Sequence, residues 1–249
     1  VGYFGFGTEF IESEVKAKFP NATVERIDTD NLSSQKELQE KLDLFKNKKI
    51  DILLGTQMVA KGLNFPNLKL VGVIMADTGL HLPDFRAAER TFSLIVQVAG
   101  RAGRFFPDGK VIVQSYTPNR SAIYYACKNN IENFYNEELE QRQILAFPPF
   151  ARLIRLVFRS PIQEVAANAA NSASEIINSF IEKYNYDNFE VLGPSECPLS
   201  KISANYRYQI ILRSESIKTI QSATARFIYN YKNKQGVYIE VDVDPTNLL

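Results

Sequence analysis

The chain has 249 residues, 45% of them hydrophobic and 23% charged, and its formal net charge at pH 7 is +1. This composition is typical of a globular protein, and the length is sufficient for two domains with buried cores. The balanced charge excludes a strongly basic polyelectrolyte, so any contact with nucleic acid has to come from a local groove.

The first half of the chain alternates predicted helices with predicted strands. Helical spacing predicts helices at residues 8–19, with Thr8 as the cap, at 34–48, opened by Ser33 or Ser34, and from Pro83 or Asp84 into the Gly-Arg steps near residue 100. Strands are predicted at residues 23–27, 50–54, 69–76 and 110–116. This alternation predicts an α/β fold with a parallel, doubly wound sheet.

Two carboxylates, Asp28 and Asp30, follow the first predicted strand. Carboxylates at the carboxyl end of a strand often lie at the ligand-binding edge of an α/β sheet. The other interpretation is that they cap the helix that comes next, and the sequence leaves both interpretations open.

The second half of the chain predicts a different fold. One long helical segment is expected at residues 121–145, and Pro148-Pro149 stops it. Beyond these prolines we expect strands at residues 153–159, 189–192, 206–213 and 238–243, helices at 162–184 and 216–232, and a loop containing Gly193-Pro194 and Pro198. The order βαββαβ predicts a smaller, ferredoxin-like α+β domain.

Cysteine and histidine usage limits the metal chemistry. Cys127 and Cys197 stand far apart without CxxC spacing, and His81 is the one histidine. We therefore expect no disulfide, no metal site and a reducing cytoplasmic location. No apolar run approaches the roughly 20 residues of a membrane span, so no membrane partner is expected. The chain starts at Val1 without an initiator methionine, and we expect it to be a fragment of a longer protein.

The segment Gln97–Arg104, QVAGRAGR, carries the strongest chemical signal. Arg101 and Arg104 lie three residues apart at one helical end, so their planar guanidiniums can converge on one phosphate. Gly100 leaves room for a close backbone approach. The alternative is a helix that ends in a glycine cap, with basic residues near its negative pole.

A second signal, Gly55–Gly62, directly follows a predicted strand. Backbone amides at such a strand end can point at phosphate, and a Thr hydroxyl suits contact with a nucleic-acid backbone. We predict DNA contacts from Thr56, Gln57 and Lys61, with Gly62 permitting close approach. The alternative for Thr56 is a plain helix N-cap.

These motifs carry a resemblance to a known family. The Gln97–Arg104 string resembles motif VI of superfamily 2 helicases, and Ile52–Pro66 resembles motif V of the PriA-type primosomal replication-restart helicases of bacteria. The match continues through Asp84–Arg90. It implies a RecA-like second motor lobe at residues 1–118, a helical connector at 119–150 and a carboxyl-terminal domain at 151–249.

The resemblance also implies an activity. The full-length parent would be an ATP-dependent 3′-to-5′ DNA helicase that assembles the primosome at stalled forks. It would bind ATP and Mg²⁺, and zinc upstream of this fragment. The fragment has no GxxxxGK[ST] string, so we expect it to bind none of these cofactors itself and to be inactive alone. The rival functions are a non-unwinding double-stranded DNA translocase and a vestigial motor lobe that serves as a binding module.

Residue roles follow from the matched motifs. Arg101 and Arg104 are expected at the γ-phosphate as arginine fingers and Gln97 near the phosphates; Gly62 and Gly100 are expected at the nucleotide. Arg86 and Arg90 are expected near DNA or between lobes. The alternative for the last two is a helical salt-bridge face worth a few tenths of a kcal/mol.

The carboxyl-terminal domain carries a predicted partner site. Lys201, Tyr206 and Arg207 form a basic, aromatic-flanked spot. By resemblance this domain binds branched and single-stranded DNA, other primosome proteins, and the acidic tail of single-stranded DNA-binding protein, for which Arg207 is the expected anchor. A structural Arg-Tyr edge is the alternative.

Overall fold

The computed structural model describes residues 7–28, 34–56, 65, 68–102, 109–232 and 235–249, and it divides the chain into two compact units. The N-terminal unit is Val1–His81 with Ala88–Phe134, and the C-terminal unit is Leu82–Ala87 with Tyr135–Leu249. A six-residue segment thus belongs to the C-terminal unit although the chain on either side of it belongs to the other. The predicted domain boundaries at residues 118 and 150 stay a prediction.

The strands of the N-terminal unit form two parallel pairs. β1 (Val24–Ile27) pairs with β2 (Ile52–Gly55), and β3 (Leu70–Val73) pairs with β4 (Lys110–Val113). The parallel direction is confirmed, but among the described residues the two pairs are separate sheets rather than the predicted continuous one. The strands of a doubly wound sheet are buried on both faces. The β3–β4 pair is not, because Leu70 and Ile112 are exposed.

Two of these strands end earlier than predicted. β3 stops before Ala76, which begins a 3₁₀ helix, η1 (Ala76–His81). β4 stops at Val113, and beyond it the backbone N–H groups of Tyr116 and Thr117 donate to a side chain, Asp77.

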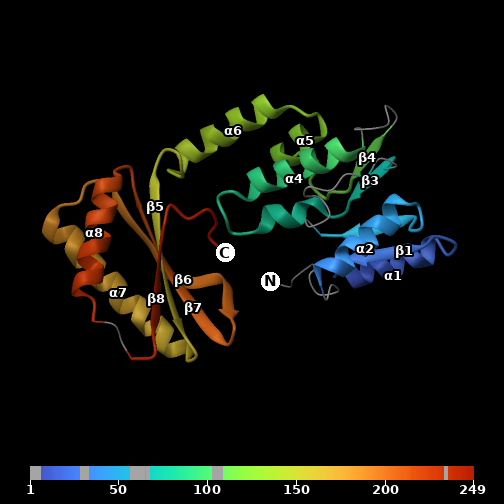
Figure 1. Ribbon diagram of the computed structural model, residues 1–249. Helices are drawn as coiled ribbons and strands as arrows, with labels where there is room; N and C mark the ends of the chain where they lie inside the picture. Colours follow the sequence, from blue (N-terminus) through green and yellow to red (C-terminus); the bar gives the residue numbers. More distant parts are fainter. Residues whose placement is uncertain (1–6, 29–33, 57–64, 66–67, 103–108, 233–234) are drawn as a thin grey trace. The chain divides into compact units, whose positions relative to one another are not determined.

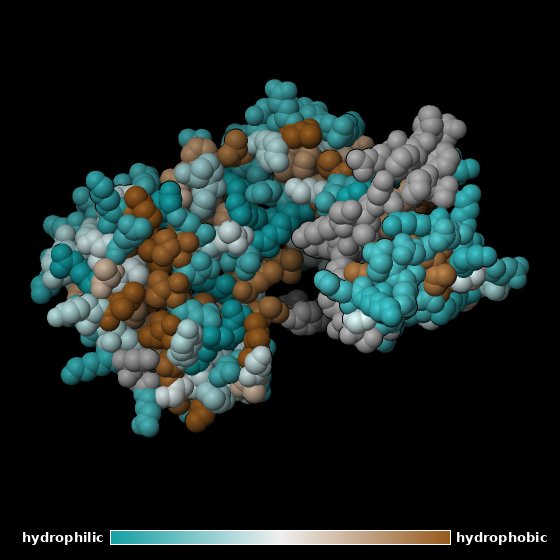
Figure 2. Space-filling view, in the orientation of Figure 1, coloured by the Kyte–Doolittle hydropathy of each residue, from teal (hydrophilic) through white to brown (hydrophobic). Residues whose placement is uncertain are grey.

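Among the described residues, five α-helices begin in or next to the N-terminal unit. They are α1 (Thr8–Lys18), α2 (Gln35–Lys46), α4 (Ala87–Ala102), α5 (Ser121–Cys127) and α6 (Ile131–Ile144). Ser34 caps α2 as predicted, since its side chain accepts from the backbone N–H of Glu37 at 3.2 Å. Figure 2 shows a mostly hydrophilic surface over α1 and α2 with a few hydrophobic spots, and Phe10 and Leu44 are exposed hydrophobic side chains of these helices.

The prediction that Thr8 caps α1 is wrong. Gly7 holds the cap position without a side-chain hydrogen bond. The Thr8 hydroxyl donates instead to the Asp28 carboxylate at 2.6 Å, which ties the start of α1 to the end of β1.

The predicted single helix at residues 121–145 is two helices. Asn129 has a φ of 51° and ends α5, because asparagine adopts the left-handed conformation at low cost. The next residue, Asn130, then opens α6, and its side chain accepts from the backbone N–H of Asn133 at 3.1 Å.

The C-terminal unit contains an antiparallel four-stranded sheet in the order β6-β7-β5-β8. Its elements run β5 (Arg152–Ser160), α7 (Gln163–Tyr184), β6 (Phe189–Ile202), β7 (Asn205–Ser214), α8 (Ile217–Asn230) and β8 (Tyr238–Val243). The predicted βαββαβ order is therefore confirmed. Both helices cover one face of the sheet (Figure 1), where Leu156, Phe158 and Ile210 are fully buried.

An alanine stripe on α7 sets how closely this helix packs. Ala166, Ala169, Ala170 and Ala173 are fully buried, and Ala169, Ala170 and Ala173 belong to the core that also contains Ile154 of β5. Small side chains allow the helix backbone to approach the sheet, so the alanine-rich composition of this segment has a packing role.

The predicted loop between residues 192 and 206 is wrong. β6 runs through it, with register shifts between Leu192 and Ser195 and between Glu196 and Lys201. An edge strand tolerates prolines, because its outer N–H groups pair with no neighbour. The hairpin closes through Ser203 and Ala204, whose φ values of 48° and 63° are typical of a two-residue turn.

Candidate functional site

The last turns of α4 present three of the predicted site residues. Gln97 and Arg101 lie four residues apart and therefore share a helix face. Gln97 and Gly100 are exposed and Arg101 is half-buried. A methyl group added at Gly100 would meet no atom within 4 Å, so packing within the unit does not demand a glycine there. Arg104 lies outside the described residues.

The opposite face of α4 is fixed by hydrophobic packing. Phe92 is 3% exposed and stacks on Phe134 of α6, with ring centroids 4.0 Å apart and planes inclined by 2°. Ile95 joins the same core, together with Ala122 and Ile123 of α5. α4 is therefore held on one side, and its other side carries Gln97 and Arg101.

Asp77 is a buried carboxylate that the sequence analysis missed. It accepts hydrogen bonds from Ser115 Oγ at 2.9 Å, from Tyr116 N at 2.8 Å, and from both the backbone N–H and the hydroxyl of Thr117. Burial by itself raises the pKa of the Asp77 carboxyl, but these hydrogen bonds outweigh it and lower the pKa to about 2. All these donors come from the residues after β4, so Asp77 fastens η1 to that end of the strand.

Of the two carboxylates predicted after β1, the structure describes Asp28 only. Asp28 is buried, accepts from Thr8, and lies 3.3 Å from Arg26 Nε in an ion pair. Ser34 caps the next helix, so the helix-cap interpretation is wrong for Asp28, while a position at the ligand-binding edge of the sheet stays a prediction. Asp30 lies outside them.

The predicted DNA contacts are only partly described. Thr56 is exposed and follows β2 directly, as expected of a residue at a sheet edge. Gln57, Lys61 and Gly62 lie outside the described residues.

The segment Asp84–Arg90 does not form one helical face. α4 begins at Ala87, so Asp84, Phe85 and Arg86 precede it, and the intrahelical salt-bridge interpretation fails for them. Asp84 accepts from the backbone N–H groups of Arg86 at 2.8 Å and of Leu248 at 3.0 Å. Arg86 belongs to the C-terminal unit, whereas Arg90 lies on α4 in the N-terminal unit.

The predicted partner residues, on β6 and β7, lie on the two opposite faces of the sheet. Lys201 and Tyr206 lie together, with the Lys201 ammonium 4.5 Å from the Tyr206 ring centroid. Arg207 points to the other side of the sheet because side chains alternate along a strand, and it is 7% exposed, donating to Leu199 O at 3.1 Å. The structure thus brings two of the three together and buries the third.

Arg207 belongs to a buried polar group on the sheet face away from the helices. Arg155 of β5 donates to Gln209 Oε1 at 2.8 Å and to Leu249 O at 2.9 Å. Burial raises the pKa of the Cys197 thiol, while the charges of Arg155 and Arg207 act against that rise. Sequence alternation in β5 and β7 could have revealed that Arg155, Arg207 and Gln209 share one face.

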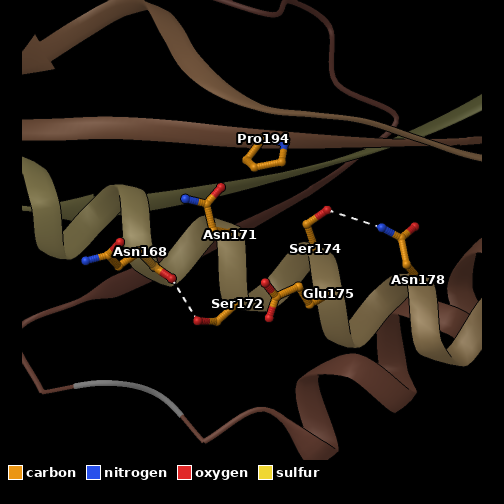
Figure 3. A pocket seen from close by; sticks show the side chains of 7 residues that line it. All are labelled: Asn168, Asn171, Ser172, Ser174, Glu175, Asn178 and Pro194. Carbon is orange, nitrogen blue, oxygen red and sulfur yellow. Dashed lines mark hydrogen bonds between the residues drawn. The ribbon is translucent and has the colours of Figure 1, made fainter.

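An open, polar groove of about 580 Å³ runs between α7 and Pro194 of β6 (Figure 3). The Ser172 hydroxyl donates to Asn168 O at 2.9 Å, so it is satisfied within its own helix. The groove residues are Asn168, Asn171, Ser172, Ser174, Glu175, Asn178 and Pro194. None of them was a predicted site residue.

The described residues contain neither a cluster of metal-ligating side chains nor a helix that could span a membrane. No group of three or more His, Cys, Asp or Glu side chains in them could hold a metal ion. No helix in the same part of the chain is long and apolar enough to cross a bilayer.

Comparisons with known proteins match both halves of the chain. Residues 4–106 match the family described as helicase conserved C-terminal domain, and residues 143–246 match the primosomal protein N C-terminal domain. Replication restart protein PriA of Treponema pallidum is 47% identical over 99% of this chain, that of Borreliella burgdorferi 42% over 100%, and that of Bacillus subtilis 38% over 98%. The chain spans 37%, 37% and 30% of the lengths of these three relatives.

Proposed function

Because this chain belongs to the family of PriA replication restart proteins, we propose that it works as the second, RecA-like motor lobe and the ferredoxin-like carboxyl-terminal domain of an ATP-dependent 3′-to-5′ DNA helicase. One observation carries the proposal: α4 is anchored by Phe92 and Ile95 and carries Gln97 and Arg101 on one face, within the region that matches the helicase family. The helicase would act in the cytoplasm, at stalled replication forks.

The residues on α4 have the chemistry of a phosphate-stabilising site. Arginine stays charged and forms paired hydrogen bonds with phosphate, so Arg101 and Arg104 suit the role of arginine fingers, with Gln97 beside them. The described residues offer no carboxylate cluster for Mg²⁺. By homology with the relatives, we propose that ATP, its Mg²⁺ and the zinc are held elsewhere in the full-length protein, while Gly62 and Gly100 let the nucleotide approach this chain.

The remaining predicted residues are proposed as contacts with DNA and proteins. Thr56, Gln57 and Lys61 would meet the DNA backbone, in single-stranded or branched DNA, through sequence-independent phosphate contacts. Arg86 and Arg90 would lie near DNA or between lobes. Lys201, Tyr206 and Arg207 would bind the acidic tail of single-stranded DNA-binding protein, and the same domain would meet other primosome proteins.

The test is the DNA-stimulated ATPase rate of the full-length protein. Removing an arginine finger costs on the order of 10³–10⁵ in rate, so Arg101→Ala and Arg104→Ala should abolish turnover. Arg226→Ala is the matched control, since this arginine lies on α8 against the Tyr184 ring, far along the chain from the helicase motifs. If the Arg101→Ala and Arg104→Ala variants both keep more than about a tenth of wild-type turnover, the assignment fails. A forked-duplex assay then separates unwinding from translocation without unwinding.

A further inference from the structure

The segment Leu82–Ala87 is fastened to the C-terminal unit by several contacts. Phe85 stacks on Phe147, with ring centroids 5.5 Å apart and planes inclined by 10°. The Arg142 guanidinium lies 5.3 Å from the centroid of the Phe85 ring. Asp84 accepts from the backbone N–H of Leu248 at 3.0 Å. These contacts involve α6, the residues after it, and the end of the chain, so the segment is bound from more than one side.

The groups that receive Phe85 are themselves held in place. Arg142 is 9% exposed, pairs with Glu138 Oε1 at 2.9 Å and donates to Pro148 O at 3.3 Å. On the other ring, the Arg213 guanidinium of β7 lies 5.8 Å from the Phe147 centroid and donates to Leu145 O at 2.7 Å. The stack therefore connects Phe85 to the sheet of the C-terminal unit through Phe147 and Arg213.

The same two stretches of chain also meet in the N-terminal unit. Phe92, seven residues after Phe85, stacks on Phe134, which lies eight residues before Arg142 on α6. α6 (Ile131–Ile144) is one continuous helix across both contacts. α6 thus contacts Phe92 through Phe134 near its start and the Phe85 ring through Arg142 near its end.

We propose that Phe85 is a positioning residue that couples the C-terminal unit to the end of α4 carrying Gln97 and Arg101. Arg101 is fourteen residues after Ala87, about 21 Å along the axis of one helix. α4 is one continuous helix over that length, so a shift of its first turn is expected to move its last turn as well. What binds the C-terminal unit would then change nucleotide turnover. This coupling rests on the proposed motor function of α4.

The first test needs only this chain and no ATP. Hydrogen exchange of the α4 amides is compared for wild type, Phe85→Ala, Phe85→Tyr and Phe147→Leu. Loss of the aromatic pair should raise exchange at residues 94–102 by about tenfold in Phe85→Ala and Phe147→Leu, while Phe85→Tyr, which keeps the ring, stays near wild type. The matched control is Phe180→Ala, a ring packed on the core of the C-terminal unit away from the stack.

Two outcomes would overturn the coupling in this chain. One is unchanged exchange at residues 94–102 in both Phe85→Ala and Phe147→Leu. The other is an equal rise in Phe180→Ala, because that would show general loosening of the unit.

The second test uses the full-length protein. Phe85→Ala should lower the DNA-stimulated kcat about tenfold and leave the KM for ATP and the Kd for DNA within about twofold, with rescue by Phe85→Tyr. An equal fall in Phe180→Ala contradicts the coupling. If the wild-type protein hydrolyses no ATP, the motor function itself fails, and the exchange experiment still decides whether Phe85 positions α4.

Discussion

Asp77 and Thr117, forty residues apart, are joined through both the backbone and the side chain of the threonine. The Thr117 N–H donates to Asp77 Oδ1 at 3.1 Å, and the Thr117 hydroxyl donates to the same oxygen. Tyr116 N occupies the second carboxylate oxygen at 2.8 Å. The carboxylate thus accepts the backbone N–H groups of two consecutive residues after β4 and ties them to η1.

Asp77→Asn should destabilise the protein by about 2–3 kcal/mol. The asparagine NH₂ group would face N–H and O–H donors that the carboxylate now accepts, and the remaining hydrogen bonds would no longer be assisted by a charge. Urea unfolding measures this loss. Asp51→Asn is the control with a smaller expected effect. The Asp51 carboxylate accepts one described backbone hydrogen bond, from Thr23 N at 2.8 Å, so this substitution should cost about 1 kcal/mol or less. Equal costs for the two variants would contradict the role of Asp77.

The same carboxylate predicts a pH dependence. The pKa of Asp77 is lowered to about 2 in the folded chain, below the ordinary value of about 3.9 for an unfolded aspartate. Its stabilising contribution is therefore complete above roughly pH 4–5 and is lost as the pH falls toward 2. The difference in unfolding free energy between wild type and Asp77→Asn should be flat from pH 7 to pH 5 and shrink below pH 4. If this difference in unfolding free energy grew as the pH falls, the lowered pKa of Asp77 would be contradicted.

Gly100→Ala should separate stability from function. Alanine in a helix is favoured over glycine by about 0.5–1 kcal/mol, and the structure leaves open space for the methyl group. The chain should thus become more stable to urea, while the ATPase rate of the full-length protein falls if a nucleotide has to approach this backbone. Gly72→Ala is the matched control, as a methyl group there also meets nothing within 4 Å. Unchanged turnover in Gly100→Ala would remove Gly100 from the nucleotide site.

Asn129 should tolerate glycine but not valine. Its φ of 51° costs a β-branched residue about 1–2 kcal/mol, and glycine adopts it freely. Thermal unfolding should place Asn129→Gly near wild type and Asn129→Val clearly lower. If Asn129→Val is as stable as wild type, the break between α5 and α6 does not depend on this backbone conformation.

If Arg207 anchors the acidic tail, Arg207→Ala should weaken binding of an acidic peptide at least about tenfold, since removing a charge that pairs with a carboxylate of the partner costs more than removing a charge at the rim of the interface. Fluorescence anisotropy with a labelled acidic tail peptide measures the effect. Arg207→Lys keeps the charge, and Lys201→Ala removes an exposed one, so both should bind more tightly than Arg207→Ala. Because Arg207 is buried, circular dichroism has to show that each variant is folded. Wild-type affinity in a folded Arg207→Ala variant would remove it as the anchor.

The sequence predicted most of the C-terminal unit, because its core follows simple periodicities. Alternation in β5 and β7 and the alanine spacing of α7 correspond to burial of Leu156, Ile210 and Ala170. The prediction from the sequence was wrong at β6, where Gly193-Pro194 and Pro198 indicated a loop. Those residues are tolerated because β6 is an edge strand, and edge position is a tertiary property.

The sequence motifs predicted which residues belong to the candidate site, but not the long-range contacts around it. The placement of Gln97, Gly100 and Arg101 on the last turns of one helix follows from helical spacing and is confirmed. The contacts of Asp77 and Phe85 could not be predicted, since their partners Thr117 and Phe147 lie 40 and 62 residues away. Arg207 was expected between aromatic side chains, yet its neighbours in sequence point to the other face of the sheet.

The assignment of Leu82–Ala87 to the C-terminal unit has a consequence for how the gene can be divided. The chain passes between the two units three times, after His81, after Ala87 and after Phe134. A single cut at any one of these places leaves one product without part of its own unit. Cutting after Phe134, for example, removes Phe85 from the ring of Phe147. A C-terminal piece that begins at Tyr135 therefore lacks the stack of Phe85 on Phe147 and the hydrogen bond from Leu248 N to Asp84.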